Sequence, residues 1–529
     1  MPAHTGSPIA QKGQPSNQAR TTRKLTSKRW RIAAMTALLV AAAAGVALSD
    51  SVGLVIPKLQ VFGDPDGAFA TINTGGPTAT STNPFFLNMG TNGRACVTCH
   101  QPIDAFSITP PHLQQRFYAT GGTDPVFRTV DGATCPTADV STVEKRLRAY
   151  SLLLSRGLIR IFITVPATAN YEVMSVNNPY GCNATDVISM YRRPLPTTNL
   201  TFLSTVMFDG RESTTITGTT KISFSNYPSS LMSDLAHQSV DATVTHAQGD
   251  GTRPTAAEQQ EIVNFETQLF TAQVFDSRAG LLNQNGANGG PALLTTQPFF
   301  ISINSSVHPL VPALEQPGGL VTPGDGQFTP DIFNLFGAWT QYSGDLAEAR
   351  RSVARGEALF NSLPIPITAV AGINDDVTAG GLVAGGIPTL QGTCGTCHDT
   401  PNVGNHSFPT PLNIGTGDPS PTSPSVNLGG LDVSYLPQIT VCLKDATTGL
   451  PTNTCKTTTD LGQALIDGNF DHVGKIKGPI LRGLAGRAPY FHNGSAATLM
   501  DVVDFYNARF TLNLTDQQRR DLAAFLNTL

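Results

Sequence analysis

Two short stretches of this chain each set two cysteines three positions apart, with a histidine directly after the second. They read "CVTCH" at residues 96–100 and "CGTCH" at residues 394–398. A structural zinc site usually draws its ligands from two such pairs close in sequence, and neither pair here has a second CxxC nearby. A redox dithiol would not need the adjacent histidine. Covalent haem attachment needs all three residues, because the thiols bond to the porphyrin and the histidine binds the iron.

Two such motifs predict two covalently bound haem c groups. Eight cysteines and ten histidines in 529 residues would rarely produce one match by chance, and the chain has two. The residues expected to hold the groups are Cys96, Cys99 and His100 for the first haem, and Cys394, Cys397 and His398 for the second.

The first 49 residues are typical of an export signal. They hold seven basic and no acidic residues, and end in an apolar, alanine-rich run with cleavage expected after Ala47 or Ser49. A retained membrane anchor is the alternative, since this run nearly spans a bilayer. Cleavage would leave no stable membrane span and a periplasmic or secreted protein. The remainder would be more acidic than the whole chain, whose net charge is −4, which argues against nucleic-acid binding.

Four cysteines lie outside the two motifs. In an oxidising compartment they are expected to form two disulfides. The pairing by proximity is Cys442 with Cys455, closing a short loop, and Cys135 with Cys182, closing a longer one.

An internal repeat supplies the elements around each motif. Helices are expected from Thr255 and from Thr515, each opening with a capping box and sharing apolar positions, such as Phe265 and Phe525. Upstream, "MFDGRES" at 207–213 parallels "YFHNGSA" at 490–496, and "DLAHQS" at 234–239 parallels "TLMDVV" at 498–503.

The repeat predicts a mainly α fold, with two cytochrome c-like haem domains and long irregular loops. Residues 1–49 would be the signal peptide, 50–330 the N-terminal haem domain with loop insertions, and 331–529 the C-terminal cytochrome c domain. The boundary is expected in the Pro/Gly-rich stretch 308–330, and residues 64–84 are expected to form an irregular strap. Ser343 is expected to cap the helix that opens the second domain.

The segment "LRGLAGRAPYFHNGSAATLMDVVDFYN", with "NGRACVTCHQP", "FDGR" and the C-terminal helix, resembles the bacterial dihaem cytochrome c peroxidase superfamily. That superfamily includes the dihaem enzyme that matures the tryptophan tryptophylquinone cofactor. The resemblance implies oxygen chemistry at the first haem and electron exchange at the second. It also implies a Ca²⁺ between the domains, although no acidic loop here suits a dedicated site.

The resemblance implies a distal ligand for the second haem fourteen residues beyond His492, where this chain has Tyr506. The alternative is a core tyrosine with a satisfied hydroxyl. Tyr506 lies on a helix expected from Thr498, and the only methionine beyond Cys397 is Met500. His406, His472 and His492 are rival ligands.

The family has a Glu–Gln pair beside the open face of the first haem, and the corresponding pair here is His237–Gln238. His237 could serve as the acid–base group, could bind the iron, or could be a surface histidine on a polar loop, as could His246. Glu212, next to "FDGR", is a substitute carboxylate.

These features favour a peroxidase-like haem oxidoreductase that takes hydrogen peroxide or dioxygen as its small-molecule oxidant and a redox protein as its electron donor. The alternatives are a non-enzymatic electron-transfer cytochrome and a haem-dependent oxygenase. Trp339 could either relay electrons between the haems or pack at the domain interface.

Overall fold

The computed structural model describes residues 54–213, 216–217, 221–222, 229–298, 331–376, 381, 384–407, 411–419 and 431–529. All of them belong to one compact unit, Val52–Leu529. The expected export signal and the expected domain boundary at 308–330 lie outside the described residues, so both stay predictions. None of the helices in the described part of the chain is long and apolar enough to cross a bilayer.

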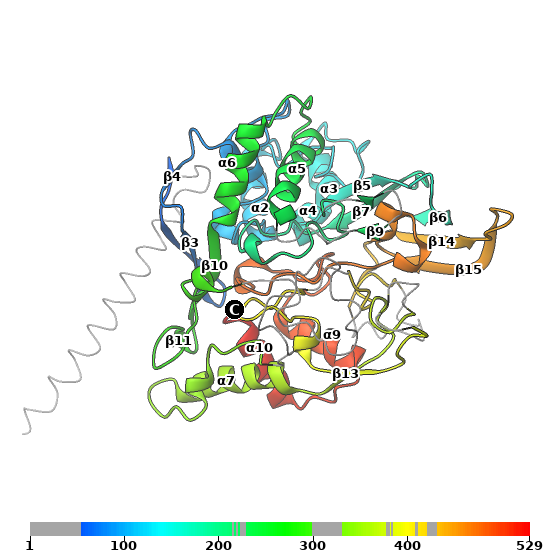
Figure 1. Cartoon of the computed structure of the whole chain (residues 1–529). Helices are drawn as coiled ribbons and strands as arrows, with labels where there is room; N and C mark the ends of the chain where they lie inside the picture. The colour runs from blue at the N-terminus through cyan, green and yellow to red at the C-terminus, as the bar shows by residue number, and fades with distance from the viewer. Residues whose placement is uncertain are drawn as a thin grey trace, which may run out of the picture. The chain divides into compact units, whose positions relative to one another are not determined.

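The expectation of a mainly α fold is wrong, because the described residues mix helices with several antiparallel sheets (Figure 1). The helices are α2 (Pro110–Thr120), α3 (Val143–Ala149), α4 (Ser151–Arg156), α5 (Ser229–Thr245), α6 (Ala256–Thr267), α7 (Ala347–Ser362), α8 (Ala464–Asp467), α9 (Leu499–Arg509) and α10 (Asp516–Leu526).

The largest sheet has the order β11-β10-β3-β2. Its strands are β2 (Leu59–Asp64), β3 (Gly67–Asn73), β10 (Leu269–Asp276) and β11 (Gly280–Leu281). The expected irregular strap at 64–84 is therefore wrong over its first part: "DPDG" is the turn of a hairpin, and β3 is a central strand. Pairing of β3 with β10 brings together segments about 200 residues apart, which no local pattern reveals.

One further sheet joins the two halves of the chain, and the remaining ladders lie within one half. β6 (Tyr171–Asn177) pairs with β14 (Gln438–Lys444), which pairs with β15 (Pro451–Thr458). β5 (Ile159–Thr164) pairs with β7 (Val187–Arg192), and β12 (Ile365–Ile367) with β13 (Leu390–Gly392). Two-residue ladders join β1 (Val55–Ile56) to β4 (Thr78–Ala79), and β8 (Ile216–Thr217) to β9 (Lys221–Ile222). Residues in a strand repeat every two positions and not every 3.6, so these segments show no helical periodicity.

The two expected disulfides are confirmed. Cys135 bonds to Cys182 and Cys442 to Cys455. Cys442 and Cys455 are also cross-strand partners of β14 and β15, so this disulfide fixes the register of that hairpin.

The repeated helices are confirmed as well. Thr255 caps α6 and Thr515 caps α10, each through a complete capping box. Thr498 caps α9 in the same way. The cap expected at Ser343 is wrong, because α7 begins at Ala347 with Leu346 in the N-cap position.

The core packing repeats with the helices. The ring of Phe265 on α6 lies 5.0 Å from that of Phe85, whose ring in turn lies 6.4 Å from His100. On α10, Phe525 lies 5.7 Å from Phe360, and Phe360 lies 6.0 Å from His398. Each CxxCH histidine is thus backed by a phenylalanine that the capped helix holds in place.

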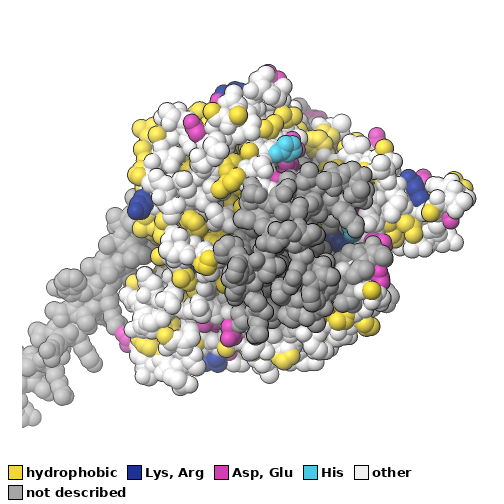
Figure 2. All heavy atoms as spheres, viewed as in Figure 1, with side chains coloured by type: hydrophobic (Ala, Val, Ile, Leu, Met, Phe, Trp, Pro, Cys, Tyr) yellow, Lys and Arg dark blue, Asp and Glu magenta, His cyan; other side chains and the backbone are white. Residues whose placement is uncertain are grey.

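The surface bears no basic stripe on the face drawn in Figure 2, where the lysines and arginines of the described residues are few and separate. Hydrophobic side chains there are scattered in small groups. This face is unlike the electropositive surface that a nucleic acid requires.

Candidate functional sites

The two CxxCH motifs fold into the same short turn, η2 (Cys96–Thr98) and η9 (Cys394–Thr396). In each, the histidine amide donates to the carbonyl of the first cysteine at 3.0 Å. The hydroxyl of the threonine accepts a hydrogen bond from the amide just before the motif, at 3.0 Å for Thr98 and 2.9 Å for Thr396. All four thiols are free, whereas the other four cysteines form disulfides.

A backbone carbonyl holds Nδ1 of each histidine. His100 Nδ1 lies 3.2 Å from the Phe106 carbonyl oxygen, and His398 Nδ1 lies 2.6 Å from that of Gly404. A carbonyl accepts only, so Nδ1 carries the proton and Nε2 keeps its lone pair. Burial lowers the pKa of His100 to about 4 and also lowers that of His398. Both imidazoles are therefore neutral, as an iron ligand must be.

A cavity lies against each motif. The first, about 160 Å³, is lined by Cys96, Cys99 and His100 and by apolar side chains that include Ile159, Ile161, Leu200, Leu203 and Ile262. The second, about 240 Å³, is lined by Cys394, Cys397 and His398 and by Leu363, Ile365, Leu412, Val503 and Leu522, among others.

The residues present fit haem. Each cavity combines two thiols, an imidazole held by a backbone carbonyl and apolar walls that suit the porphyrin ring. Cationic groups that suit the two propionates also line them: Arg94, Arg192, Arg193, Arg211 and Lys477 in the first, and Arg193, Lys477 and Arg487 in the second.

A single layer of residues separates the two cavities. Pro194, Leu195, Phe208, Lys477 and Ile480 line both. Lys477 is buried and donates to the Thr205 carbonyl at 2.8 Å, and burial lowers its pKa to about 7. Groups bound in the two cavities would therefore be close neighbours.

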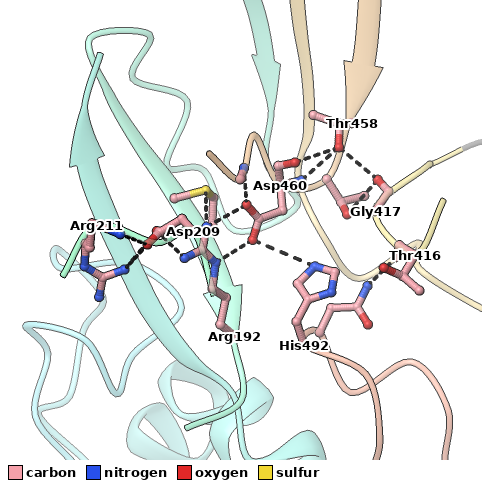
Figure 3. A network of polar contacts seen from close by, with 12 residues as sticks. Arg192, Asp209, Arg211, Thr416, Gly417, Thr458, Asp460 and His492 are labelled. Atoms are coloured by element: carbon pink, nitrogen blue, oxygen red, sulfur yellow. Dashed lines mark hydrogen bonds and ion pairs between the residues drawn. The ribbon is translucent and has the colours of Figure 1, made fainter. Parts of the chain in front are cut away.

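A buried ionic network runs beside this layer (Figure 3). Arg192, at the end of β7, binds both oxygens of Asp460 at 2.7 and 2.8 Å and one oxygen of Asp209 at 2.5 Å. Asp460 also lies 3.8 Å from Nε2 of His492. Since Arg192 lines the first cavity and His492 the second, the network connects the two cavity walls and joins residues far apart in the chain.

The structure places Tyr506 in the wall of the second cavity, together with the cysteines and His398. Its ring packs against Phe505 and Phe510. No described residue hydrogen-bonds its hydroxyl, and burial raises its pKa. Met500 is absent from the residues that line this cavity, whereas the rival ligands His406 and His492 are among them. His472 instead pairs with Asp467 at 2.5 Å.

His237 and Glu212 come together, with Nδ1 2.7 Å from Oε2. His237 lies on helix α5 and not on a loop, its side chain is 67% exposed, and it is absent from the lining of the first cavity. Burial raises the pKa of Glu212 to about 7, and the hydrogen bond that His237 donates to Glu212 raises the pKa of His237. With Asp241 these two residues form a group that could hold a metal ion.

The residue that sequence reasoning missed is His246, which lines the first cavity and pairs with Asp131. Trp339, by contrast, lines neither cavity. It packs against Phe336 and donates to the Gln284 carbonyl, which fits the packing alternative.

Helices α5 and α9 line their cavities with the same spacing. The residues are Leu235, Gln238, Ser239, Ala242 and His246 in the first cavity, and Leu499, Val502, Val503, Tyr506 and Phe510 in the second. This extends the sequence correspondence of 234–239 with 498–503. Ala242 thus has the place in the first cavity that Tyr506 has in the second.

The turns before these helices also correspond. Met207 and Phe491 have φ of 64° and 63°, and Gly210 and Gly494 have 77° and 67°. Ring contact between Phe208 and His492, at 6.1 Å, brings the two turns together. The structure therefore aligns Met207 with Phe491, whereas the sequence segments 207–213 and 490–496 align Met207 with Tyr490, one residue earlier.

Comparison with known proteins gives partial matches. No family model matches the chain. Cytochrome-c peroxidase IdrP2 of Denitromonas iodatirespirans is 39% identical over 98 residues, 17% of this chain and 26% of that protein. Cytochrome-c peroxidase IdrP1 of the same organism is 41% identical over 72 residues, 12% of this chain and 19% of that protein. The chain thus spans about a quarter or less of these relatives, and the matches support a cytochrome c peroxidase-like relationship over that part.

Proposed function

We propose that this protein is an exported oxidoreductase that carries two haem c groups and uses peroxide as its oxidant. The observation that carries the proposal is the pair of neighbouring cavities, each lined by a CxxCH turn with two free thiols and a buried, neutral histidine. The similarity to cytochrome-c peroxidases of other bacteria supports the choice of oxidant.

The cysteines and histidines of the motifs would hold the cofactors, with His100 and His398 as iron ligands. Haem supplies reversible electron transfer and, where an axial position is open, a place for an oxygen-containing ligand. Ala242 leaves room in the first cavity, where the oxidant would bind. Tyr506 would fill the corresponding position in the second cavity, which would receive electrons from a redox protein.

Two finer assignments belong to the same proposal. Glu212 and His237 would assist proton movement from the edge of the first site, since Arg211 and Gln238, their chain neighbours, line that cavity. A Ca²⁺ between the two halves stays a prediction from the family resemblance.

The test uses the ferric protein with both haems attached. We expect one high-spin site that binds cyanide, and steady turnover of hydrogen peroxide with a reduced c-type cytochrome as donor. Two low-spin sites unaffected by cyanide would instead identify an electron-transfer cytochrome. Turnover with dioxygen but not with peroxide would identify an oxygenase.

A variant separates the two sites. Replacing Cys394 and Cys397 by alanine should lower the protein mass by one haem and abolish turnover with the protein donor. Cyanide binding in the first cavity should persist, because its own motif is unchanged. Retention of both haems in this variant would show that the second motif does not attach the cofactor.

A further inference from the structure

His246 lies at the end of helix α5, inside the first cavity. Its amide still donates to the Ala242 carbonyl at 2.9 Å, so it continues the helical turn. Its ring nitrogen Nδ1 lies 2.6 Å from Oδ2 of Asp131, a residue 115 positions away in the chain. The side chain is 26% exposed, so the imidazole reaches both the cavity and its edge.

Asp131 is itself held by Arg94, whose Nη1 lies 2.5 Å from its other oxygen. The Asp131 side chain is 1% exposed. Burial alone would raise its pKa, but Arg94 and His246 hold that pKa below the ordinary value, so the carboxyl is ionised. An ionised carboxylate accepts only, so Nδ1 donates to Asp131, and in the neutral imidazole the lone pair is on Nε2. No described residue hydrogen-bonds Nε2.

The helix presents His246 together with two other residues. Gln238, Ala242 and His246 follow one another at steps of four and so share one face of the helix, which lines the cavity. The corresponding face of α9 is Val502, Tyr506 and Phe510. The first cavity therefore has an amide, a small residue and an imidazole where the second has two apolar side chains around a phenol.

We infer that His246, oriented by Asp131, is the group that moves a proton for peroxide bound in the first cavity. This inference rests on the proposed function. Nε2 takes the proton from one peroxide oxygen and returns it to the other, so that the O–O bond breaks and the second oxygen leaves as water. The remaining oxygen becomes a second water by taking two protons from solvent and two electrons from the protein donor. The imidazole ends each cycle unchanged.

The positions of the two histidines on the helix favour His246 over His237 as the group that moves the proton. Their positions differ by nine, which on a helix of 3.6 residues per turn is about two and a half turns and puts the two side chains on opposite sides. His237 accordingly faces outward, and His246 faces the cavity.

Cyanide binding to the ferric protein with both haems attached tests the inference without using peroxide. Hydrogen cyanide must give up its proton before the anion binds, so a proton acceptor in the cavity controls the association rate. We expect His246→Leu to lower that rate about tenfold or more, and peroxide turnover by about a hundredfold or more. Asp131→Asn should lower both by a smaller factor, because the imidazole remains but loses its orientation.

His112→Gln is the matched control. His112 also holds an aspartate at 2.6 Å, Asp104, but lines neither cavity, so both rates should be unchanged. His246→Gln keeps a similar size if the leucine variant fails to load haem. Cyanide association within twofold of wild type in both His246 variants would overturn the inference. A larger loss of the cyanide association rate in His237→Ala would also overturn it. So would a ferric spectrum that changes from low-spin to high-spin when His246 is replaced, because that change would identify His246 as an iron ligand.

The outcomes also separate this inference from the proposed function. A wild-type protein that turns over no peroxide, yet binds cyanide more slowly once His246 is replaced, would refute peroxide use and retain the proton-moving role of His246.

Discussion

Glu266→Gln should make the folded protein more stable, and increasingly so as the pH rises. Glu266 lies near the end of α6, is 3% exposed and lines the first cavity. No described residue hydrogen-bonds its Oε2. Burial without a partner raises its pKa from 4.5 to about 8. The folded protein therefore keeps this proton over a pH range in which the unfolded chain has lost it.

The sign and size of the effect follow from proton linkage. Below pH 4.5 both states hold the proton, and the group has no effect on the free energy of unfolding. Between pH 4.5 and about 8 the unfolded state binds fewer protons, so stability falls as the pH rises. The loss is complete above pH 8 and amounts to about 5 kcal/mol at most, at 1.36 kcal/mol per pKa unit. Glutamine has nearly the same shape and no proton to lose.

The assay is urea unfolding of the protein with both haems attached, at pH 5, 7 and 9. The stability difference between Glu266→Gln and wild type should be small at pH 5 and grow by several kcal/mol at pH 9. Glu261→Gln, exposed on the same helix, is the control and should show no such growth. A difference that does not change with pH would show that Glu266 is ionised in the folded protein. A variant less stable at every pH would show that the carboxyl has a partner.

Three further perturbations test other parts of the structure. Tyr506→Phe should remove a tyrosinate-to-iron charge-transfer band and raise the potential of the second site by on the order of 100 mV, because a phenolate favours the ferric state. Asp460→Ala should lower the free energy of unfolding by about 3–5 kcal/mol, because it leaves the buried Arg192 without its two-point partner. Replacing Cys442 and Cys455 by serine should lower the free energy of unfolding by about 3 kcal/mol, as expected for a disulfide between cysteines 13 positions apart.

Controls for these variants are available in the chain. Tyr435→Phe removes a hydroxyl that donates to the Asn493 carbonyl and lines neither cavity, so the spectrum should not change. Asp186→Ala removes an exposed carboxylate that forms no ion pair among the described residues. An unchanged ferric spectrum in Tyr506→Phe would make this residue a core tyrosine. Urea midpoints equal to wild type in the Asp460 or cysteine variants would contradict the corresponding stability estimate.

Local features of the fold were predictable from sequence, and long-range ones were not. The capping boxes of α6 and α10 depend on residues three positions apart, and each disulfide follows from the few cysteines left over. Two of the sheets depend on pairing between distant segments, β3 with β10 and β6 with β14. No unbroken alternation of polar and apolar residues marks these strands in the sequence, so the predicted fold class was wrong.

The same distinction applies to the candidate sites. The CxxCH turns are local, and their sequence indicated the cofactor, whereas the Asp131–His246 pair spans 115 positions. One local signal could have found His246. Residues 229–245 form a helix, and a helix puts Gln238, Ala242 and His246 on one face and His237 on the opposite one. Treating 237–246 as a loop removed that information.

Duplication explains why the two cavities are alike, and three substitutions explain why they differ. The CxxCH turn, the backing phenylalanine and the capped helix are the same in both halves, so both can hold the same cofactor. The first cavity has Ala242, His246 and Glu266 where the second has Tyr506, Phe510 and Leu526. Ala242 leaves space in the first cavity, and His246 and Glu266 add groups that can carry a proton. The corresponding side chains in the second cavity are larger or apolar. Two sites that shared one role would not need this difference, whereas the proposed reacting site beside the proposed electron-storing site would.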